Sequence, residues 1–269
     1  MNIKTISESI SKAYRQVPIA ISDIKVFRTA INTFYLSLSN YGKEGNLETY
    51  LRDFLRSTFY SNNDINKPDD SDIDWAVRLG DKDTPIGIII ENKKPSNKSE
   101  MITKDNLNKK AMQELVYYYL EERLNGNTDI RYLIANNMYE FFFFDAREFE
   151  RCFYDNKELI REYKDFKNNA KTNNTTDKFY KEIASKYIHQ VQENIFFTYI
   201  DLQTYKNAII SDDDSKLKSL VPLYRIFSDI HLLKRSFQND NNTLNDAFYK
   251  ELLYILGLRE AKIDNKVKK

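Results

Sequence analysis

A short and almost wholly apolar run, Ile86-Gly87-Ile88-Ile89-Ile90, constrains the fold of this chain more than any other feature. A run of this length between polar segments is typical of a strand that is buried on both faces, as happens where helices cover both sides of a sheet. The run ends directly in three polar residues, Glu91, Asn92 and Lys93. The sequence therefore predicts an α/β protein whose central strand carries charged groups to the end of the sheet.

The periodicities on either side of this run predict the other elements. Apolar residues at helical spacing predict helices over residues 5–16, 22–39, 45–60 and 107–124, and alternating or apolar segments predict strands over 72–78, 131–135 and 139–144. Beyond residue 145 the pattern is helical over 146–168, 177–194, 216–234 and 246–258, and a short strand fits Phe196–Leu202. We expect two regions: a core with N-terminal helices over residues 1–150, and a helical annex over 151–269.

Composition narrows the class of protein. The chain has 41 Lys and Arg residues against 40 Asp and Glu residues, a balance that neither favours nor excludes nucleic-acid binding. Cys152 is the only cysteine, which excludes a disulfide framework and a cysteine-based zinc site. His189 and His231 are too far apart for metal-ligand spacing. No apolar segment has the length of a membrane span or the form of a signal peptide, so we expect a cytoplasmic protein without a membrane partner.

The chemistry is concentrated where the predicted strands end. Residues two apart on a strand share a face, so Glu91 and Lys93 emerge together, and a hairpin pairing of the two strands would bring Asp74 beside them. Charged groups at the edge of an apolar core are costly unless they bind something or each other. Two carboxylates that hold Mg²⁺, with a lysine that stabilises developing negative charge, meet that requirement. The alternative is structural, because strands commonly end in charged residues and this spacing also arises by chance.

A cluster of basic residues follows this motif. It consists of Lys94, Lys98, Lys104, Lys109 and Lys110. Lysines at such a position can contact DNA phosphates, which is the sequence-independent part of DNA binding. The alternative is a solvated basic surface whose charge is relieved by nearby acids.

The spacing of the acidic and basic groups, within a helix–strand–strand–helix order, resembles the PD-(D/E)XK nuclease superfamily. The segments IIIENKKPSNKSEM, NLNKKAMQELVYYYLEER and DIRYLIANNMYEFFFFDAREFE are similar to the N-terminal regions of fused type IIG restriction endonuclease–methyltransferases. The similarity extends to SKAYRQVPI, ETYLRDFLRSTFY, FFTYIDL, LVPLYRIFSDIHLLKRSF and FYKELLYILGL, and so covers nearly the whole chain. It implies a restriction-endonuclease-like mixed sheet flanked by helices, and bacterial phage defence by Mg²⁺-dependent hydrolysis of double-stranded DNA, with Mn²⁺ as a substitute metal.

The resemblance assigns roles to the central residues. It implies that Asp74 and Glu91 bind the metal and that Lys93 is the motif lysine. Asp72 is a rival to Asp74 because it shares the same strand face. Asp74 is preferred, since the superfamily aspartate usually precedes an apolar strand such as Trp75–Val77.

Two further assignments rest on the resemblance. Relatives often add a helical glutamate before the first of these strands, and Glu44 and Glu48 are the candidates, each with a solvated surface acid as the alternative. Gln113 and Tyr117 resemble the Q-x-x-x-Y element that some relatives carry on the helix after the lysine. A polar position on an amphipathic helix explains Gln113 equally well.

The resemblance also implies partners. Full-length relatives continue into a methyltransferase and a target-recognition domain, but these 269 residues contain neither a glycine-rich cofactor loop nor an N-P-P-Y motif. We therefore expect no S-adenosylmethionine site, and a fragment or separate subunit that works with those domains in cis or on another chain. Cleavage of both strands implies that two nuclease domains meet. The rival hypotheses are a catalytically inactive nuclease-fold module that binds DNA or protein, and a purely helical scaffold.

Overall fold

The centre of the molecule is a mixed sheet. The computed structural model describes residues 2–39, 45–68, 73–169, 175–236, 246–257, 261–263 and 266–268. Within these residues the sheet has seven strands in the order β1-β7-β6-β5-β4-β3-β2. The strands are β1 (Asn2–Lys4), β2 (Ile65–Asn66), β3 (Trp75–Arg78), β4 (Ile86–Asn92), β5 (Tyr132–Asn136), β6 (Glu140–Asp145) and β7 (Phe196–Asp201). The predicted α/β class is therefore confirmed, and the hypothesis of a purely helical scaffold is wrong.

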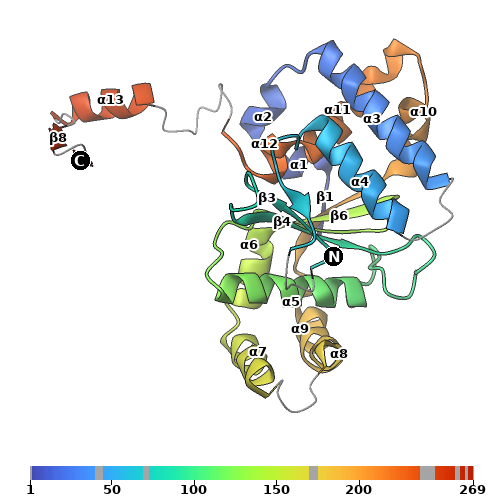
Figure 1. Ribbon diagram of the computed structural model, residues 1–269, viewed down its shortest axis with the longest axis vertical. Coiled ribbons are helices and arrows are strands. Elements are labelled where there is room, and N and C mark those ends of the chain that lie inside the picture. The colour runs from blue at the N-terminus through green and yellow to red at the C-terminus, as the bar shows by residue number, and fades with distance from the viewer. Residues whose placement is uncertain are drawn as a thin grey trace.

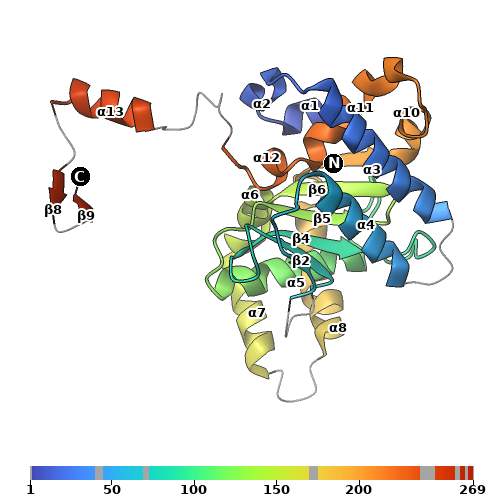
Figure 2. The ribbon, with the colours of Figure 1, turned by 45° about the horizontal axis from the view of Figure 1, so that its top comes forward.

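Helices cover both faces of the sheet (Figure 1). One face carries α1 (Ile6–Ser9), α2 (Lys12–Gln16), α3 (Ile21–Ser39), α4 (Gly45–Thr58), α10 (Lys206–Ile209), α11 (Leu217–Phe227) and α12 (Asp229–Leu232). The other carries α5 (Lys110–Leu124), α6 (Ala146–Phe149), α7 (Lys157–Asn169), α8 (Thr176–Lys178) and α9 (Ser185–Val191). Figure 2 shows α7 and α8 projecting from the α5 face, and α13 (Asp246–Ile255) and the hairpin of β8 (Ala261–Ile263) and β9 (Lys266–Lys268) apart from the sheet.

Strand β4 explains why both faces need helices. It pairs in parallel with β5 and antiparallel with β3, and all of its residues except Asn92 are buried. Ile88 and Ile90 belong to the core under α3 and α4, whereas Ile89 belongs to the core under α5. Because side chains alternate along a strand, Glu91 points to the α5 face.

Several expectations need correction. The helix expected over residues 5–16 is two helices, because the Ser11 side chain accepts a hydrogen bond from the Tyr14 backbone and starts α2 anew. The strand expected over residues 72–78 is confirmed but shorter, because β3 begins at Trp75, and it is buried on both faces, with Ala76 in one core and Val77 in the other. Strands β1 and β2 were not expected.

The short strand through Phe196–Leu202 is confirmed as β7. It lies between β1 and β6, so one sheet draws on both sides of the expected division at residue 150. No helix within the described ranges is long and apolar enough to span a membrane.

Candidate functional site

The β3–β4 hairpin brings the predicted carboxylates together. Trp75 lies opposite Ile90 in the antiparallel register, so Asp74, one residue earlier, lies beside Glu91. The backbone N–H of Asn92 donates to Oδ2 of Asp74 at 3.3 Å. The expected pairing of the two strands is thus confirmed, and both carboxylates lie at the end of the central strand.

Lys93 joins this hairpin to helix α5. Its Nζ lies 2.6 Å from Oε1 of Glu91 and 2.6 Å from Oε2 of Glu114. The group is nearly closed to water, with exposed side-chain fractions of 1 % for Glu91 and 10 % for both Lys93 and Glu114. One ammonium therefore bridges two carboxylates, one on β4 and one on α5.

The electrostatics of the group reflect an excess of negative charge. Burial, followed by repulsion from Glu114 and Asp74, raises the pKa of Glu91 well above its usual value despite the opposing effect of Lys93. Burial disfavours the charged form of Lys93, but Glu91 and Glu114 outweigh it and raise the pKa of the lysine. Burial and the same carboxylates raise the pKa of Tyr118. The cluster would be stabilised by added positive charge.

The donor set fits a hard divalent cation. Oε2 of Glu91 is buried and has no hydrogen-bond partner, and the Asp74 carboxylate lies beside it. Carboxylate oxygens are the ligands that Mg²⁺ prefers, and a cation here would relieve both the unpaired oxygen and the repulsion. Among the described residues, no three His, Cys, Asp or Glu side chains are arranged as a complete metal site. Asp72 and Glu44 lie outside the described residues.

An open cavity of about 530 Å³ lies over this cluster. Its walls include Glu48, Asp74, Asn92, Lys93, Lys94 and Glu100. Oε2 of Glu48, from α4, accepts a hydrogen bond from Trp75 Nε1 at 2.9 Å. Of the two glutamates proposed from the sequence, Glu48 thus reaches the site, and Lys94 reaches its wall.

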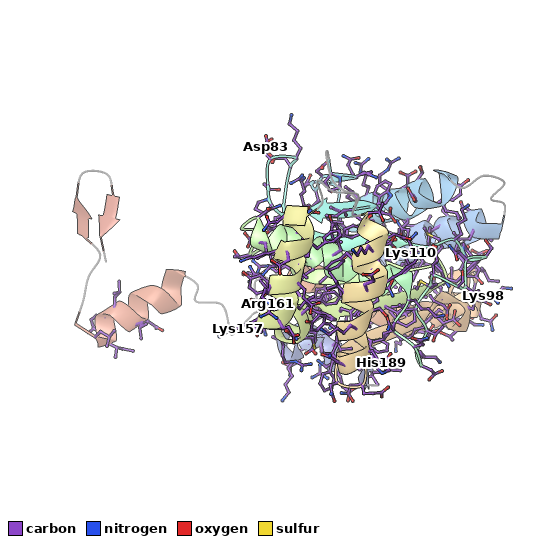
Figure 3. The ribbon with its side chains drawn as sticks, turned by 90° about the horizontal axis from the view of Figure 1, so that it is seen from below. Asp83, Lys98, Lys110, Lys157, Arg161 and His189 are labelled. Atoms are coloured by element: carbon purple, nitrogen blue, oxygen red, sulfur yellow. The ribbon has the colours of Figure 1, made fainter. Side chains whose placement is uncertain are left out.

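Other expected residues lie elsewhere. Gln113 donates to Oδ1 of Asn108 at 3.1 Å, and the Tyr117 hydroxyl accepts from Lys167 at 2.9 Å, so neither bond reaches the carboxylates. Lys98 is exposed at the periphery of the molecule (Figure 3). Lys110 pairs with both Glu100 and Glu114, at 3.5 and 3.8 Å. Lys104 stands over the Tyr199 ring, 4.9 Å from its centre.

Glu114 is the site residue that sequence reasoning missed. It follows Ala111 by three residues and precedes Tyr118 by four, which places it within the apolar stripe of α5. A carboxylate at a core-facing helical position costs free energy unless it is paired. That position was the signal that could have singled out Glu114 rather than its neighbour Gln113.

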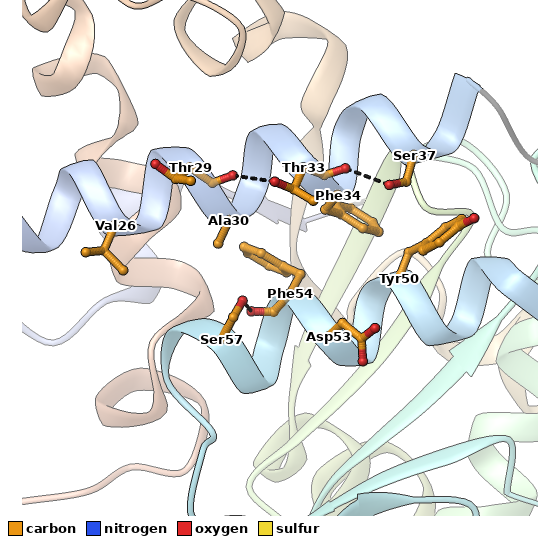
Figure 4. Close-up of a pocket in the computed structure, with 10 residues that line it drawn as sticks. All are labelled: Val26, Thr29, Ala30, Thr33, Phe34, Ser37, Tyr50, Asp53, Phe54 and Ser57. Atoms are coloured by element: carbon orange, nitrogen blue, oxygen red, sulfur yellow. Dashed lines mark hydrogen bonds between the residues drawn. The ribbon is translucent and has the colours of Figure 1, made fainter.

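A larger cavity, of about 650 Å³, lies between α3 and α4 (Figure 4). Its walls are mostly apolar and hydroxyl side chains, including Ala30, Phe34 and Phe54, with Asp53 as the one charged residue among them. It lacks the paired titratable groups that a catalytic centre needs. The candidate catalytic groups therefore lie at the smaller cavity at the end of β4.

Comparison with known proteins adds a family but no activity. No curated protein and no solved structure matched the chain. A family model described as a domain of unknown function, DUF7149, matches residues 4–240. Because this match spans far more than half of the 269 residues, the chain belongs to the DUF7149 family.

Proposed function

We propose that this chain is a metal-dependent DNA endonuclease of the PD-(D/E)XK type, the nuclease part of a type IIG-like restriction system. One observation carries the proposal. The buried Glu91 has one oxygen held by Lys93 at 2.6 Å and a second oxygen without any partner, and Asp74 lies beside it. Two carboxylates and a lysine at the end of a central strand are the groups that this chemistry requires.

Asp74 and Glu91 are the residues that would hold the metal. A divalent cation at these carboxylates would supply positive charge beside the phosphate and lower the pKa of a bound water. Mg²⁺ matches the oxygen ligands, and Mn²⁺ is an accepted substitute for such a set. Hydrolysis forms a bond from the water oxygen to phosphorus and breaks the bond from phosphorus to the leaving sugar oxygen.

Lys93 has the capacity to act on that phosphate. An ammonium has three N–H donors, and Glu91 and Glu114 accept from two of them. The third is left for a phosphate oxygen or the attacking water, since the next carboxylate, Glu100, lies 4.0 Å away, beyond hydrogen-bond distance. Glu114, on α5, keeps the ammonium in place and charged. Its role is that of a positioning residue.

The substrate and the partner domains are inferred from the resemblance to type IIG enzymes. The substrate is double-stranded DNA, with Lys94 in the cavity wall as a phosphate contact. Methylation and target recognition would come from other domains, in cis or on another chain. We expect the chain alone to cleave weakly or without sequence preference, and two nuclease domains to meet for double-strand cleavage.

The test is nicking of supercoiled plasmid in Mg²⁺ or Mn²⁺, with EDTA as the blank. Asp74→Asn keeps an oxygen for the Asn92 backbone N–H but removes the charge, and it should lower the nicking rate by about 100-fold or more. Asp83→Asn is the matched control, because this exposed carboxylate lies in the β3–β4 turn, remote from the cavity (Figure 3). Its rate should equal that of the unaltered protein.

Metal binding is measured separately. The chain has one tryptophan, Trp75, whose indole bonds to Glu48 at 2.9 Å and which follows Asp74 directly. Its fluorescence should change on addition of Mg²⁺, and Asp74→Asn should abolish the change. A protein that shows neither nicking nor a metal-dependent signal would refute the proposal and favour the inactive binding module.

A further inference from the structure

A second polar cavity lies at the opposite end of the strands. Its volume is about 490 Å³, within the range of small-molecule sites. Tyr132, the first residue of β5, lines it, whereas Asn136, the last residue of β5, pairs with Asn92 beside the candidate active site. Five residues of strand separate the two ends by roughly 13 Å. This cavity, which we call the rim pocket, is distinct from the nuclease site.

The rim pocket concentrates positive charge. Five cations line it, drawn from three segments: Lys12 and Arg15 on α2, Arg147 on α6, and Lys234 and Arg235 after α12. Glu8 and Asp145 are the carboxylates in the same lining, which leaves a net charge of +3. The whole chain carries only +1. A local excess of this kind attracts anions.

Part of this charge is free of protein partners. Lys234 is held by Asp145 at 2.8 Å, and Arg235 by Asp229 at 2.9 Å. Lys12 and Arg147 are exposed, and neither has a carboxylate partner within the described part of the chain. The Arg15 guanidinium bonds only to the Ser7 hydroxyl among described residues, at 2.9 Å. The cationic groups of Lys12, Arg15 and Arg147 are therefore available to bind a ligand.

The pocket also has an aromatic floor. The Tyr132 and His231 rings lie with centres 4.9 Å apart, and Lys234 stands over the Tyr132 ring at 5.4 Å. Burial, together with Lys234, lowers the pKa of His231 to about 4, which keeps this imidazole neutral at physiological pH. Both rings are buried and Lys234 covers the Tyr132 ring, so the cationic rim above them is the part of the pocket that suits an anionic ligand.

We propose that the rim pocket binds a phosphate-bearing ligand, with the phosphate at Lys12, Arg15 and Arg147. Arginine and lysine are the side chains that recognise phosphate oxygens, and arginine adds two parallel donors. This inference does not depend on the nuclease activity. The phosphate can come from a free nucleotide or from a nucleic-acid backbone, and the probes distinguish these sources.

The test measures binding of inorganic pyrophosphate, a fluorescent ATP analogue and a short DNA duplex by calorimetry and anisotropy. Lys12→Ala and Arg147→Ala should each weaken binding by about fivefold to tenfold. Lys157→Ala and Arg161→Ala are matched controls, because these exposed residues lie together on α7 and neither lines the rim pocket (Figure 3). They should leave the affinity unchanged.

Asp145→Asn supplies a test with the opposite sign. Asparagine keeps an oxygen for the Arg147 backbone N–H but releases the ammonium of Lys234. The pocket gains one positive charge, so the phosphate probe should bind about threefold tighter or more, an increase that a merely structural role would not produce.

Each result either supports or overturns the proposal. Binding of pyrophosphate or the ATP analogue with this variant pattern supports a free-nucleotide site, and the same pattern with the duplex alone supports a backbone-phosphate site. The proposal is overturned if no probe binds below about 1 mM. It is also overturned if the α7 controls weaken binding as much as Lys12→Ala and Arg147→Ala.

Discussion

Removal of the Lys93 side chain should destabilise the fold as well as the catalytic centre. Lys93→Ala takes away the cation that lies 2.6 Å from both Glu91 and Glu114, in a group whose side chains are at most 10 % exposed. Loss of one partner from a buried ion pair costs about 3–5 kcal/mol. Lys110 stays within 3.8 Å of Glu114 and partly compensates the charge of that carboxylate. The Glu91 carboxylate is then the one left without a cation. We therefore expect a loss near the lower limit, about 3 kcal/mol.

The assay is urea denaturation in EDTA at neutral pH. The midpoint should fall with an unchanged slope, because the surface exposed on unfolding is the same. Lys98→Ala, an exposed lysine of the same segment, should change stability by less than about 0.5 kcal/mol. The loss should shrink at lower pH, since burial and neighbouring carboxylates already raise the pKa of Glu91 and its protonation removes the bare charge.

Two companion measurements sharpen the result. The double variant Lys93→Met with Glu91→Gln should recover much of the stability, because it removes the bare carboxylate together with its cation. Mg²⁺ should stabilise Lys93→Ala more than the unaltered protein, since the metal then replaces the missing charge. A loss below about 1 kcal/mol for Lys93→Ala would refute the reasoning, because it would mean that the carboxylates do not need the lysine.

Two further predictions concern the sheet face that carries α12. His231→Leu should remove a pH dependence of the free energy of unfolding. Burial lowers the pKa of His231 from 6.5 to about 4. The neutral imidazole therefore contributes its full stability above pH 6.5, and this contribution is lost as the pH falls towards 4. The difference between the two proteins should approach about 3 kcal/mol across this window in urea titrations, and parallel pH profiles would contradict it. Gly87→Val should lower the melting temperature by about 5 °C, because a Cβ at Gly87 would lie 2.8 Å from two leucine side chains. An unchanged melting temperature would show that those leucines move freely.

The candidate site divides into a part that the sequence predicts and a part that it does not. Strand periodicity predicts that Glu91 and Lys93 share a face, and a hairpin predicts that an aspartate of the preceding strand lies beside them. The choice of Asp74 over Asp72 came from the family resemblance. Glu114 was missed, since its contact with Lys93 depends on how α5 lies across the sheet. Helical periodicity shows which side of α5 is buried, but it does not say which strand end each turn meets.

By itself, the sequence determined the α/β class, the buried strand β4 and the shared face of Glu91 and Lys93, because these follow from local periodicity. Tertiary structure alone decided that β7 enters the sheet between β1 and β6, and that α5 closes over Lys93 with Glu114. It also decided that three segments distant in sequence gather their cations around the rim pocket. These features depend on long-range pairing and packing, in which the free energy comes from burial of whole faces rather than from any local pattern.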